Sequence, residues 1–273
     1  MNARLYGVEG YLISLLKRSQ TLSYYASSRG WGFVMAWAHR VAGLLLVVYV
    51  LFHIVTLTGL QEPARFSAKM AFLDNVFFAF LEWTLAVPVI FHALNGIRLI
   101  LYELFGVRDE KRMLRWVFAL SALYVCTLGL FMALGNQHIS AGVFWLTTAL
   151  AALLVTGGVC DRVWQTQNSL GWKLQRVSAA FLFPMVCGHM FFMHLNAKAG
   201  HDVNTILERM SGMGIRVIDF VFVVVIFFHA GFGLNTIIGD TVENNRLRTG
   251  IKMASCFVVL VFAYVGLRLV ANI

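Results

Sequence analysis

Seven long apolar runs are the feature that most restricts how this chain can fold. They cover about residues 33–60, 76–105, 116–134, 141–160, 176–196, 215–238 and 251–270. Each is close to the roughly 20 residues that an α-helix needs to cross a bilayer. Hydrophobic residues make up 59% of the 273, and a soluble domain could not bury that much apolar surface. Because backbone polar groups must be satisfied inside hydrocarbon, we predict an all-α, polytopic transmembrane bundle of about seven spans.

Basic residues are distributed unevenly between the two sides of this predicted bundle. Sixteen of the 22 lysines and arginines fall on the side that holds the N-terminus, and six fall on the other. Cytoplasmic loops carry an excess of these residues, so we predict a multi-pass protein of the inner (cytoplasmic) membrane with a cytoplasmic N-terminus. The net charge of +9 then reflects these loops, and no nucleic-acid partner is expected. No cleaved signal peptide is expected either, because no small-residue cleavage site follows the first basic residues.

The chain contains an internal repeat. An arginine is followed by a histidine 13 residues later, and a His-Ala-x-x-Gly motif begins about 40 residues after that histidine. The two copies are Arg40, His53 and His92-Ala93-Leu94-Asn95-Gly96, and Arg176, His189 and His229-Ala230-Gly231-Phe232-Gly233. Self-similarity of this kind indicates a duplicated structural unit.

The repeat also predicts the domain organisation. A unit of three spans ends on the opposite side of the membrane from its start, so two units in the same orientation need one extra crossing between them. The run at 141–160 supplies this crossing. The predicted parts are 1–32, an N-terminal segment at the cytoplasmic membrane surface; 33–135, the first three-span repeat; 136–175, a linking helix and loop; and 176–273, the second three-span repeat.

Four histidines lie inside spans, where an ionisable residue suggests a functional site. His53 and His189 each lie seven residues before the outer end of their run, about 10 Å deep at about 1.5 Å per residue. His92 and His229 lie about 14–16 residues into inward-running spans, about 21–24 Å from that boundary. The two histidines of one repeat therefore cannot share a metal. Pairs between the repeats are predicted instead: His53 with His189, and His92 with His229.

Two imidazoles from facing helices suit a low-spin b haem, which transfers electrons and keeps no open position for oxygen. A single histidine could equally be a structural residue bonded to a neighbouring helix, but four at repeated positions favour metal ligation. We therefore expect two haem b groups at two depths. Zinc is disfavoured, because no Cys, Asp or third His is evident at either level. Gly96 and Gly233, about one turn beyond His92 and His229, either leave room for a porphyrin or allow close helix packing.

Polar residues near the span boundaries are further candidates. His39 and Arg40 could bind a haem propionate or a quinone head group, or be ordinary interfacial cations. Asp240 could accept a hydrogen bond there or be solvated. Glu82, near the level of the outer pair, is either a proton donor for an outer-side quinone or a protonated structural residue. Three further histidines are expected to be solvated at or beyond the outer boundary: His138, His194 and His201.

These residues resemble the membrane-anchor cytochrome b subunits of succinate dehydrogenase and fumarate reductase (complex II). The half similar to one three-span anchor subunit carries His39-Arg40-Val41-Ala42-Gly43, Phe52-His53 and Phe91-His92-Ala93-Leu94-Asn95-Gly96-Ile97-Arg98. The half similar to its partner subunit carries Gln175-Arg176-Val177-Ser178-Ala179, Gly188-His189, Phe228-His229-Ala230-Gly231-Phe232-Gly233 and Gly239-Asp240. The resemblance covers about 33–134 and 172–270, and it leaves the crossing at 141–160 outside. It implies a single-chain, di-haem anchor that corresponds to a fused pair.

The resemblance also implies a function and partners. The chain would be the membrane-anchor subunit, not the succinate-binding subunit, of succinate:quinone oxidoreductase, an enzyme of the tricarboxylic acid cycle. It would pass electrons between a cytoplasmic iron–sulfur subunit and a membrane quinone, and it would have no catalytic residue of its own. A flavoprotein subunit with FAD and membrane lipid complete the expected partners. A quinol:fumarate reductase anchor is the alternative with the same chemistry, and a transporter with proton-relay histidines is the alternative from another class.

Further site residues follow from the resemblance. Cofactor binding is expected of His39, Arg40 and Arg176, and quinone binding of Arg40, His39, Ala36 and Asp240. Relatives with a ubiquinone site at this place tend to have Ser four residues before the arginine and Tyr after the aspartate. Here those positions are Ala36 and Thr241. This difference speaks against a ubiquinone site at this place. It leaves room for menaquinone there, or for a menaquinone or ubiquinone site at the outer end.

Overall fold

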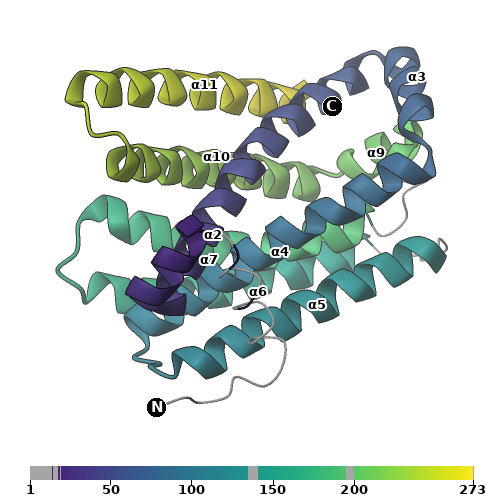
Figure 1. Ribbon diagram of the computed structural model, residues 1–273. Coiled ribbons are helices and arrows are strands. Elements are labelled where there is room, and N and C mark those ends of the chain that lie inside the picture. The colour runs from purple at the N-terminus through teal and green to yellow at the C-terminus, as the bar shows by residue number, and fades with distance from the viewer. Residues whose placement is uncertain (1–13, 15–17, 19, 135–140, 195–199, 273) are drawn as a thin grey trace.

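The structure is a computed structural model that describes residues 14, 18, 20–134, 141–194 and 200–272. Every regular element within these ranges is a helix, and seven of the helices are long and apolar enough to cross a membrane (Figure 1). They are α2 (Gln20–Leu57), α4 (Val76–Leu104), α5 (Glu110–Leu134), α6 (Ala141–Trp164), α7 (Leu170–His194), α10 (Met213–Thr241) and α11 (Asn245–Asn272). The predicted all-α, seven-span membrane bundle is confirmed.

Several helices extend beyond the apolar runs that predict them. α11 begins at Asn245, six residues before the run at 251, and α5 begins at Glu110, six before the run at 116. Intrahelical hydrogen bonding does not stop where hydrocarbon ends, so polar residues can continue a helix into the interface. The first span is also longer than its apolar run, because residues 20–28 of the predicted N-terminal segment are helical and continuous with it. Residues 1–13 of that segment lie outside the described residues.

Four helices form the centre of the bundle: α2, α4, α7 and α10. α4 packs against α2 and α7, and α10 also packs against α7 and α2. Outside them, α5 lies against α4, α6 against α7, and α11 against α10. Contacts between neighbours in the chain follow the same pattern in both predicted repeats, α2–α4–α5 and α7–α10–α11, with α6 added against α7. Each central helix carries one of the four intramembrane histidines.

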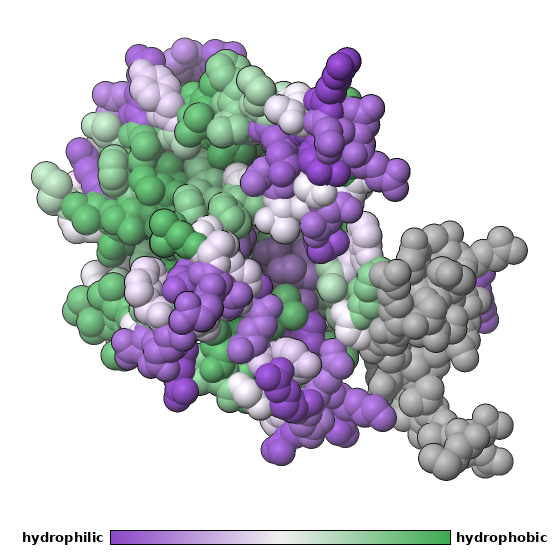
Figure 2. All heavy atoms as spheres, turned by 90° about the vertical axis from the view of Figure 1, so that its left-hand side faces the viewer, coloured by the Kyte–Doolittle hydropathy of each residue, from purple (hydrophilic) through white to green (hydrophobic). Residues whose placement is uncertain are grey.

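The helices alternate in direction, so their ends gather at two faces (Figure 1). The face formed by the connections 105–109, 165–169 and 242–244 is named the basic end, after the cations on and beside these connections. These are Arg108, Lys111, Arg112, Arg162, Lys173, Arg246 and Arg248. Figure 2 looks onto the basic end and shows hydrophilic side chains gathered there. The opposite face is named the lid end.

Three short helices cover the lid end: η1 (Thr58–Gln61), α3 (Pro63–Leu73) and α9 (Val203–Met210). α3 and α9 lie between predicted apolar runs, whereas η1 lies at the end of the run at 33–60, and the sequence predicts none of the three as separate helices. Pro63 starts α3 in its first turn, where a missing N–H costs no intrahelical bond. α3 and α9 are joined by one buried apolar cluster, made of Leu60, Phe66, Met70, Val203 and Ile206. Full burial of a side chain such as Phe66, which is 1% exposed, stabilises this contact by about 1.5–3 kcal/mol.

Asp202 caps α9 in a pH-dependent way. Its carboxylate accepts hydrogen bonds from the Thr205 backbone N–H at 2.8 Å and from the Thr205 hydroxyl at 2.6 Å. These bonds to the charged form lower the pKa of Asp202. Because the folded-state pKa is depressed, the cap stabilises α9 above the ordinary aspartate pKa of about 3.9 and is lost as the pH falls through the folded value.

We therefore expect the amides of α9 to lose protection from hydrogen exchange as the pH falls below about 4, after correction for intrinsic exchange rates. The Asp202→Asn variant should keep its protection over the same range, because asparagine caps helices without titrating. Protection that stays constant with pH in the unmodified protein would contradict this role of Asp202.

Candidate functional site

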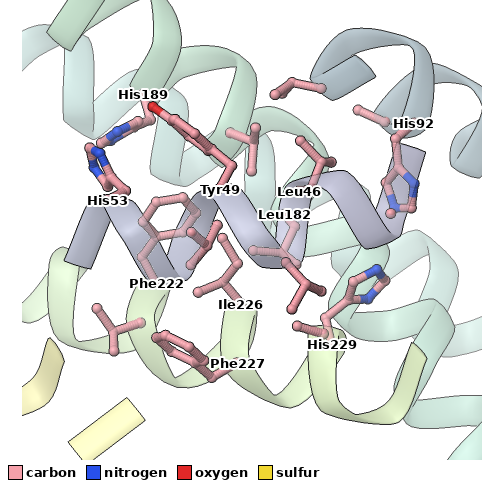
Figure 3. A pocket seen from close by; sticks show the side chains of 18 of the residues that line it. Leu46, Tyr49, His53, His92, Leu182, His189, Phe222, Ile226, Phe227 and His229 are labelled. Carbon is pink, nitrogen blue, oxygen red and sulfur yellow. The ribbon is translucent and has the colours of Figure 1, made fainter. Parts of the chain in front are cut away.

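The central helices enclose an elongated, mostly apolar cavity of about 780 Å³. This volume lies toward the upper end of the usual range for ligand pockets, roughly 300–1,000 Å³. Figure 3 shows His53 and His189 at one end of the cavity and His92 and His229 at the other. Apolar side chains line the space between them, including Leu46, Leu182, Phe222, Ile226 and Phe227. Such a cavity can hold flat, largely apolar groups that imidazoles grip from two sides.

Each end of the cavity brings together two histidines from different halves of the chain. The ring centres of His53 on α2 and His189 on α7 are 6.2 Å apart, with an interplanar angle of 88°. Those of His92 on α4 and His229 on α10 are 6.3 Å apart, with an angle of 86°. Imidazoles that bind one metal from opposite sides, at metal–nitrogen distances of about 2.0–2.1 Å, have ring centres about 6.3 Å apart. Both pairs, which are those that span depth predicts, have the spacing for one metal between them.

The two pairs lie at different depths. His39 on α2 lies at the level of His92, because their rings stack with centres 3.9 Å apart and planes 4° from parallel. His53 follows His39 by 14 residues on the same helix, which corresponds to about 21 Å along its axis. No single metal could therefore bind all four histidines. The pair of His53 and His189 is named the outer pair, and the pair of His92 and His229 the inner pair.

His92 is oriented by the backbone of α2. Its Nδ1 lies 3.1 Å from the main-chain carbonyl oxygen of His39. A carbonyl oxygen can only accept, so Nδ1 carries the hydrogen and Nε2 keeps a free lone pair. The ring can approach α2 because residue 43 is glycine, and a Cβ there would come within 3.0 Å of His92 Cε1.

His229 is oriented by α7. Its Nδ1 lies 3.1 Å from the hydroxyl oxygen of Ser178, which is buried at 6% exposure. The main-chain carbonyl of His229 also accepts a hydrogen bond from the Gln175 side chain at 3.3 Å. Nothing in the sequence alone assigns Ser178 a role, although its place two residues after Arg176 in the repeated motif marks the level of the inner pair.

His194 lies beside the outer pair, and the expectation that it is solvated is wrong. Its Nδ1 is within hydrogen-bonding distance of a carboxylate oxygen of Glu82. Its ring centre is 5.7 Å from that of His189 and 6.4 Å from that of His53. Glu82 and His194 both line the cavity, so a carboxylate and an imidazole adjoin the outer pair. Only the folded chain reveals this contact, since the two residues are 112 positions apart.

His201 is also less exposed than expected. Its side chain is 20% exposed and its Nε2 lies 3.9 Å from the carboxylate of Glu82. The reason is that His201 lies directly before α9, which packs with α3 over the lid end, so a residue past the apolar run is covered by protein. His138 lies outside the described residues.

The position of His194 also matters for whether the outer pair could bind zinc. The expectation that no third histidine lies near either pair is wrong at both levels, because His194 lies beside the outer pair and the His39 ring stacks on His92. Even so, no group of three or more His, Cys, Asp or Glu side chains across 20–134, 141–194 and 200–272 is arranged to hold a metal ion. Zinc needs three or four such ligands. The geometry therefore favours groups that take two axial imidazoles.

Two ion pairs join central helices near the basic end. Arg40 on α2 contacts Asp240 on α10 at 2.6 Å. Arg176 on α7 makes two hydrogen bonds to Glu103 on α4, at 2.8 and 2.9 Å. Its guanidinium also lies 4.3 Å from the centre of the Trp172 ring. Both arginines line the cavity, and both already have a carboxylate partner.

Other residues expected at the basic end differ in their access to the cavity. His39 lines it, whereas Ala36 and Asp240 do not. Gly96 and Gly233 also line it, and a Cβ on each would meet only one side chain at ordinary contact distance, His39 at 3.6 Å and Gln175 at 3.7 Å. These glycines therefore widen the cavity beside the inner pair rather than allow backbone contact.

Two buried polar atoms beside the inner pair have no hydrogen-bond partner in the described part of the chain. They are Nδ1 of His39 and Oε1 of Gln175. The two residues occupy equivalent positions in the predicted repeats, directly before Arg40 and Arg176. Because buried polar atoms are almost always bonded in folded proteins, these two indicate that a polar group of a ligand fits here.

The fold and the cavity define a multi-span helical membrane protein in which paired histidines from facing helices line an apolar pocket. The family model described as succinate dehydrogenase/fumarate reductase transmembrane subunit matches residues 17–131 and 162–266. These ranges make up most of the chain, and the protein therefore belongs to this family, whose members are cytochrome b membrane subunits that bind haem and quinone. The segment between them contains most of α6, the crossing that the resemblance also left out.

One relative supports the same assignment. It is the Mycobacterium tuberculosis (strain ATCC 25618 / H37Rv) protein named succinate dehydrogenase 2 membrane subunit SdhC. The two sequences are 29% identical over 108 residues, which is 38% of this chain and 76% of the relative. No solved structure matches the chain significantly.

Proposed function

We propose that the protein is a di-haem b membrane anchor of a succinate:quinone oxidoreductase. In this function it passes electrons between an iron–sulfur subunit on the cytoplasmic side and a quinone in the membrane. The observation that carries the proposal is the presence of two histidine pairs at two depths, with ring centres 6.2 and 6.3 Å apart. Membership of the family and the name of the relative support it.

The four histidines would hold two haems, with His53 and His189 at the outer site and His92 and His229 at the inner site. A b haem held by a histidine from each of two helices would supply single-electron transfer there. The cavity fits this group in shape and polarity, because its walls are mainly apolar and the unsatisfied His39 Nδ1 adjoins the inner pair. The protein itself orients the imidazoles, excludes water from the site and sets the spacing of the two pairs.

The basic end would receive the soluble partners. The positive-inside distribution of Lys and Arg supports a cytoplasmic position for this end, and hydrophilic side chains gather over parts of it (Figure 2). We place the iron–sulfur subunit here, with the FAD-containing flavoprotein subunit joined to it. The inner pair lies closer to this face than the outer pair does, which suits entry or exit of electrons at the basic end.

A quinone head group would find polar side chains at two places along the cavity. His39 and Arg40 lie at the basic end, and Glu82 with His194 lies at the lid end. Arg40 is already paired with Asp240, whereas Glu82 and His194 form a pair that can exchange protons. Reduction of a quinone consumes protons, so the chemistry of Glu82 and His194 supports the lid end.

The proposal is tested by the haem content of the purified protein. We expect two haems b per chain by pyridine haemochrome assay and b-type bands in the reduced-minus-oxidised spectrum. Replacing one histidine of each pair in the same chain, as in His53→Ala with His92→Ala, should remove both haems. Absence of b-type bands from the intact complex would overturn the proposal, and a single haem per chain would overturn its di-haem form.

Fumarate reduction is the second candidate, because the matched family includes the fumarate reductase subunit. Both enzymes use the same anchor chemistry, so the whole complex decides whether succinate is oxidised or fumarate is reduced. Turnover with succinate and quinone that exceeds turnover with quinol and fumarate supports the proposal, and the reverse ratio supports the alternative. The family match speaks against the transporter alternative.

A further inference from the structure

The two inner histidines are oriented by different kinds of hydrogen-bond acceptor. The acceptor for His92 Nδ1 is the main-chain carbonyl of His39, at 3.1 Å. The partner of His229 Nδ1 is the side-chain hydroxyl of Ser178, also at 3.1 Å. The position equivalent to Ser178 in the first repeat is Ala42, which has no hydrogen-bonding side chain. One imidazole is therefore held by backbone that no substitution removes, and the other by a single hydroxyl.

The hydrogen bonds around Ser178 place each proton. Its Oγ lies 3.0 Å from the main-chain carbonyl oxygen of Gln175, which can only accept, so the hydroxyl donates there. The lone pairs of the same oxygen are then free to accept a hydrogen from His229 Nδ1. With the hydrogen on Nδ1, Nε2 of His229 is left as the nitrogen able to bind a metal. This assignment of hydrogens gives a partner to the Gln175 carbonyl, the Ser178 hydroxyl and His229 Nδ1.

Burial makes this contact decisive for His229. Ser178 is 6% exposed, so bulk water cannot replace its hydroxyl as the acceptor. The nearby Gln175 side chain donates its amide N–H to the His229 carbonyl at 3.3 Å, and its Oε1 makes no hydrogen bond to the His229 ring. Without Ser178, the Nδ1–H of His229 would be left unpaired in an apolar site, which is costly.

We propose that Ser178 is a positioning residue for the inner haem, acting through His229. The inference rests on the proposed di-haem function. A group that accepts the second N–H of a ligating imidazole fixes its tautomer and makes it a more basic ligand. A more basic ligand favours the oxidised iron over the reduced iron. The Ser178 hydroxyl therefore lowers the midpoint potential of the inner haem and fixes the rotation of the His229 ring.

The test uses the intact complex carrying Ser178→Ala, with redox titration of the haems and low-temperature electron paramagnetic resonance of their ferric state. We expect the midpoint potential of the inner haem to move in the positive direction and its resonance to shift or broaden, while the outer haem is unchanged. Ser178→Thr keeps the hydroxyl and should restore both properties. The inner signals are identified by their absence from the His92→Ala variant.

Ser255→Ala is the matched control. Ser255 also bonds the carbonyl three residues earlier in its own helix, at 3.1 Å from Lys252 O, but it has no hydrogen bond to a histidine. We expect this variant to leave both haems unchanged. Loss of the inner haem from Ser178→Ala, with retention in Ser178→Thr and Ser255→Ala, would also support the proposal.

Two results would overturn the role of Ser178. One is an inner haem with the same potential and resonance in Ser178→Ala as in the unmodified protein. The other is an equal change in Ser178→Thr, which would point to side-chain volume rather than the hydroxyl. Both results presuppose an unmodified protein with two haems, whereas a protein without haem would instead overturn the proposed function.

Discussion

Replacement of His229 by alanine should remove one of the two haems and leave the other. His229 faces His92 at 6.3 Å between ring centres, and alanine supplies no nitrogen to complete that pair. The outer pair lies about 21 Å away along α2 and shares no ligand with the inner one. Haem content should fall from about two per chain to about one, with the inner resonance missing.

His194→Ala is the control for this experiment. His194 is a partly buried histidine on the same cavity, with its ring centre 6.4 Å from that of His53 and 5.7 Å from that of His189. It differs from the predicted ligands because its Nδ1 contacts the carboxylate of Glu82. We expect this variant to keep both haems. Two haems in His229→Ala, or loss of the outer haem in His194→Ala at the same level as in His189→Ala, would show that the ligands are assigned wrongly.

A valine at position 43 should also empty the inner site, although Gly43 supplies no ligand atom to a metal. A Cβ at this position would lie 3.0 Å from Cε1 and 3.4 Å from Nδ1 of His92. A branched side chain would come closer still and push the ring away from α2, breaking the bond from His92 Nδ1 to the His39 carbonyl. Overpacking of this kind costs about 1–3 kcal/mol when the site cannot relax. We expect loss or weak binding of the inner haem with the outer haem retained.

Gly158→Val is the control for Gly43→Val. It makes the same change of residue type within a helix but without a neighbouring histidine. Gly158 lies within α6, and a Cβ there would meet no atom within 4 Å. This variant should keep both haems and the thermal stability of the unmodified complex within experimental error. If Gly43→Val and Gly158→Val behave alike in haem content, the contact between Gly43 and His92 is not what positions the inner ligand.

The number of spans and the relative levels of the four histidines could be predicted from the sequence. All seven crossing helices coincide with apolar runs, and even the short 141–160 run corresponds to α6. The reason is that membrane thickness and helical rise are both nearly constant, so position along an apolar run converts directly into depth. Equal depth and the internal repeat together then predict that His53 lies with His189 and His92 with His229.

Contacts across helices were not predictable in the same way. Glu82 beside His194, Ser178 beneath His229 and Glu103 paired with Arg176 each depend on how a helix is rotated about its axis and on which neighbour it meets. The packing of α3 and α9 over the outer end was likewise not predictable, because both helices lie between the apolar runs.

The sequence by itself therefore determined that the chain crosses the membrane seven times and carries two levels of paired histidines. The length of an apolar run can be counted in the sequence, and the rise per residue is a constant of the α-helix. Only the tertiary structure decided what surrounds each imidazole, including the acceptors for His92 and His229 and the carboxylate next to the outer pair. Those contacts arise from side-chain packing between helices that are far apart in the chain. The spacing of residues along the sequence does not predict this packing.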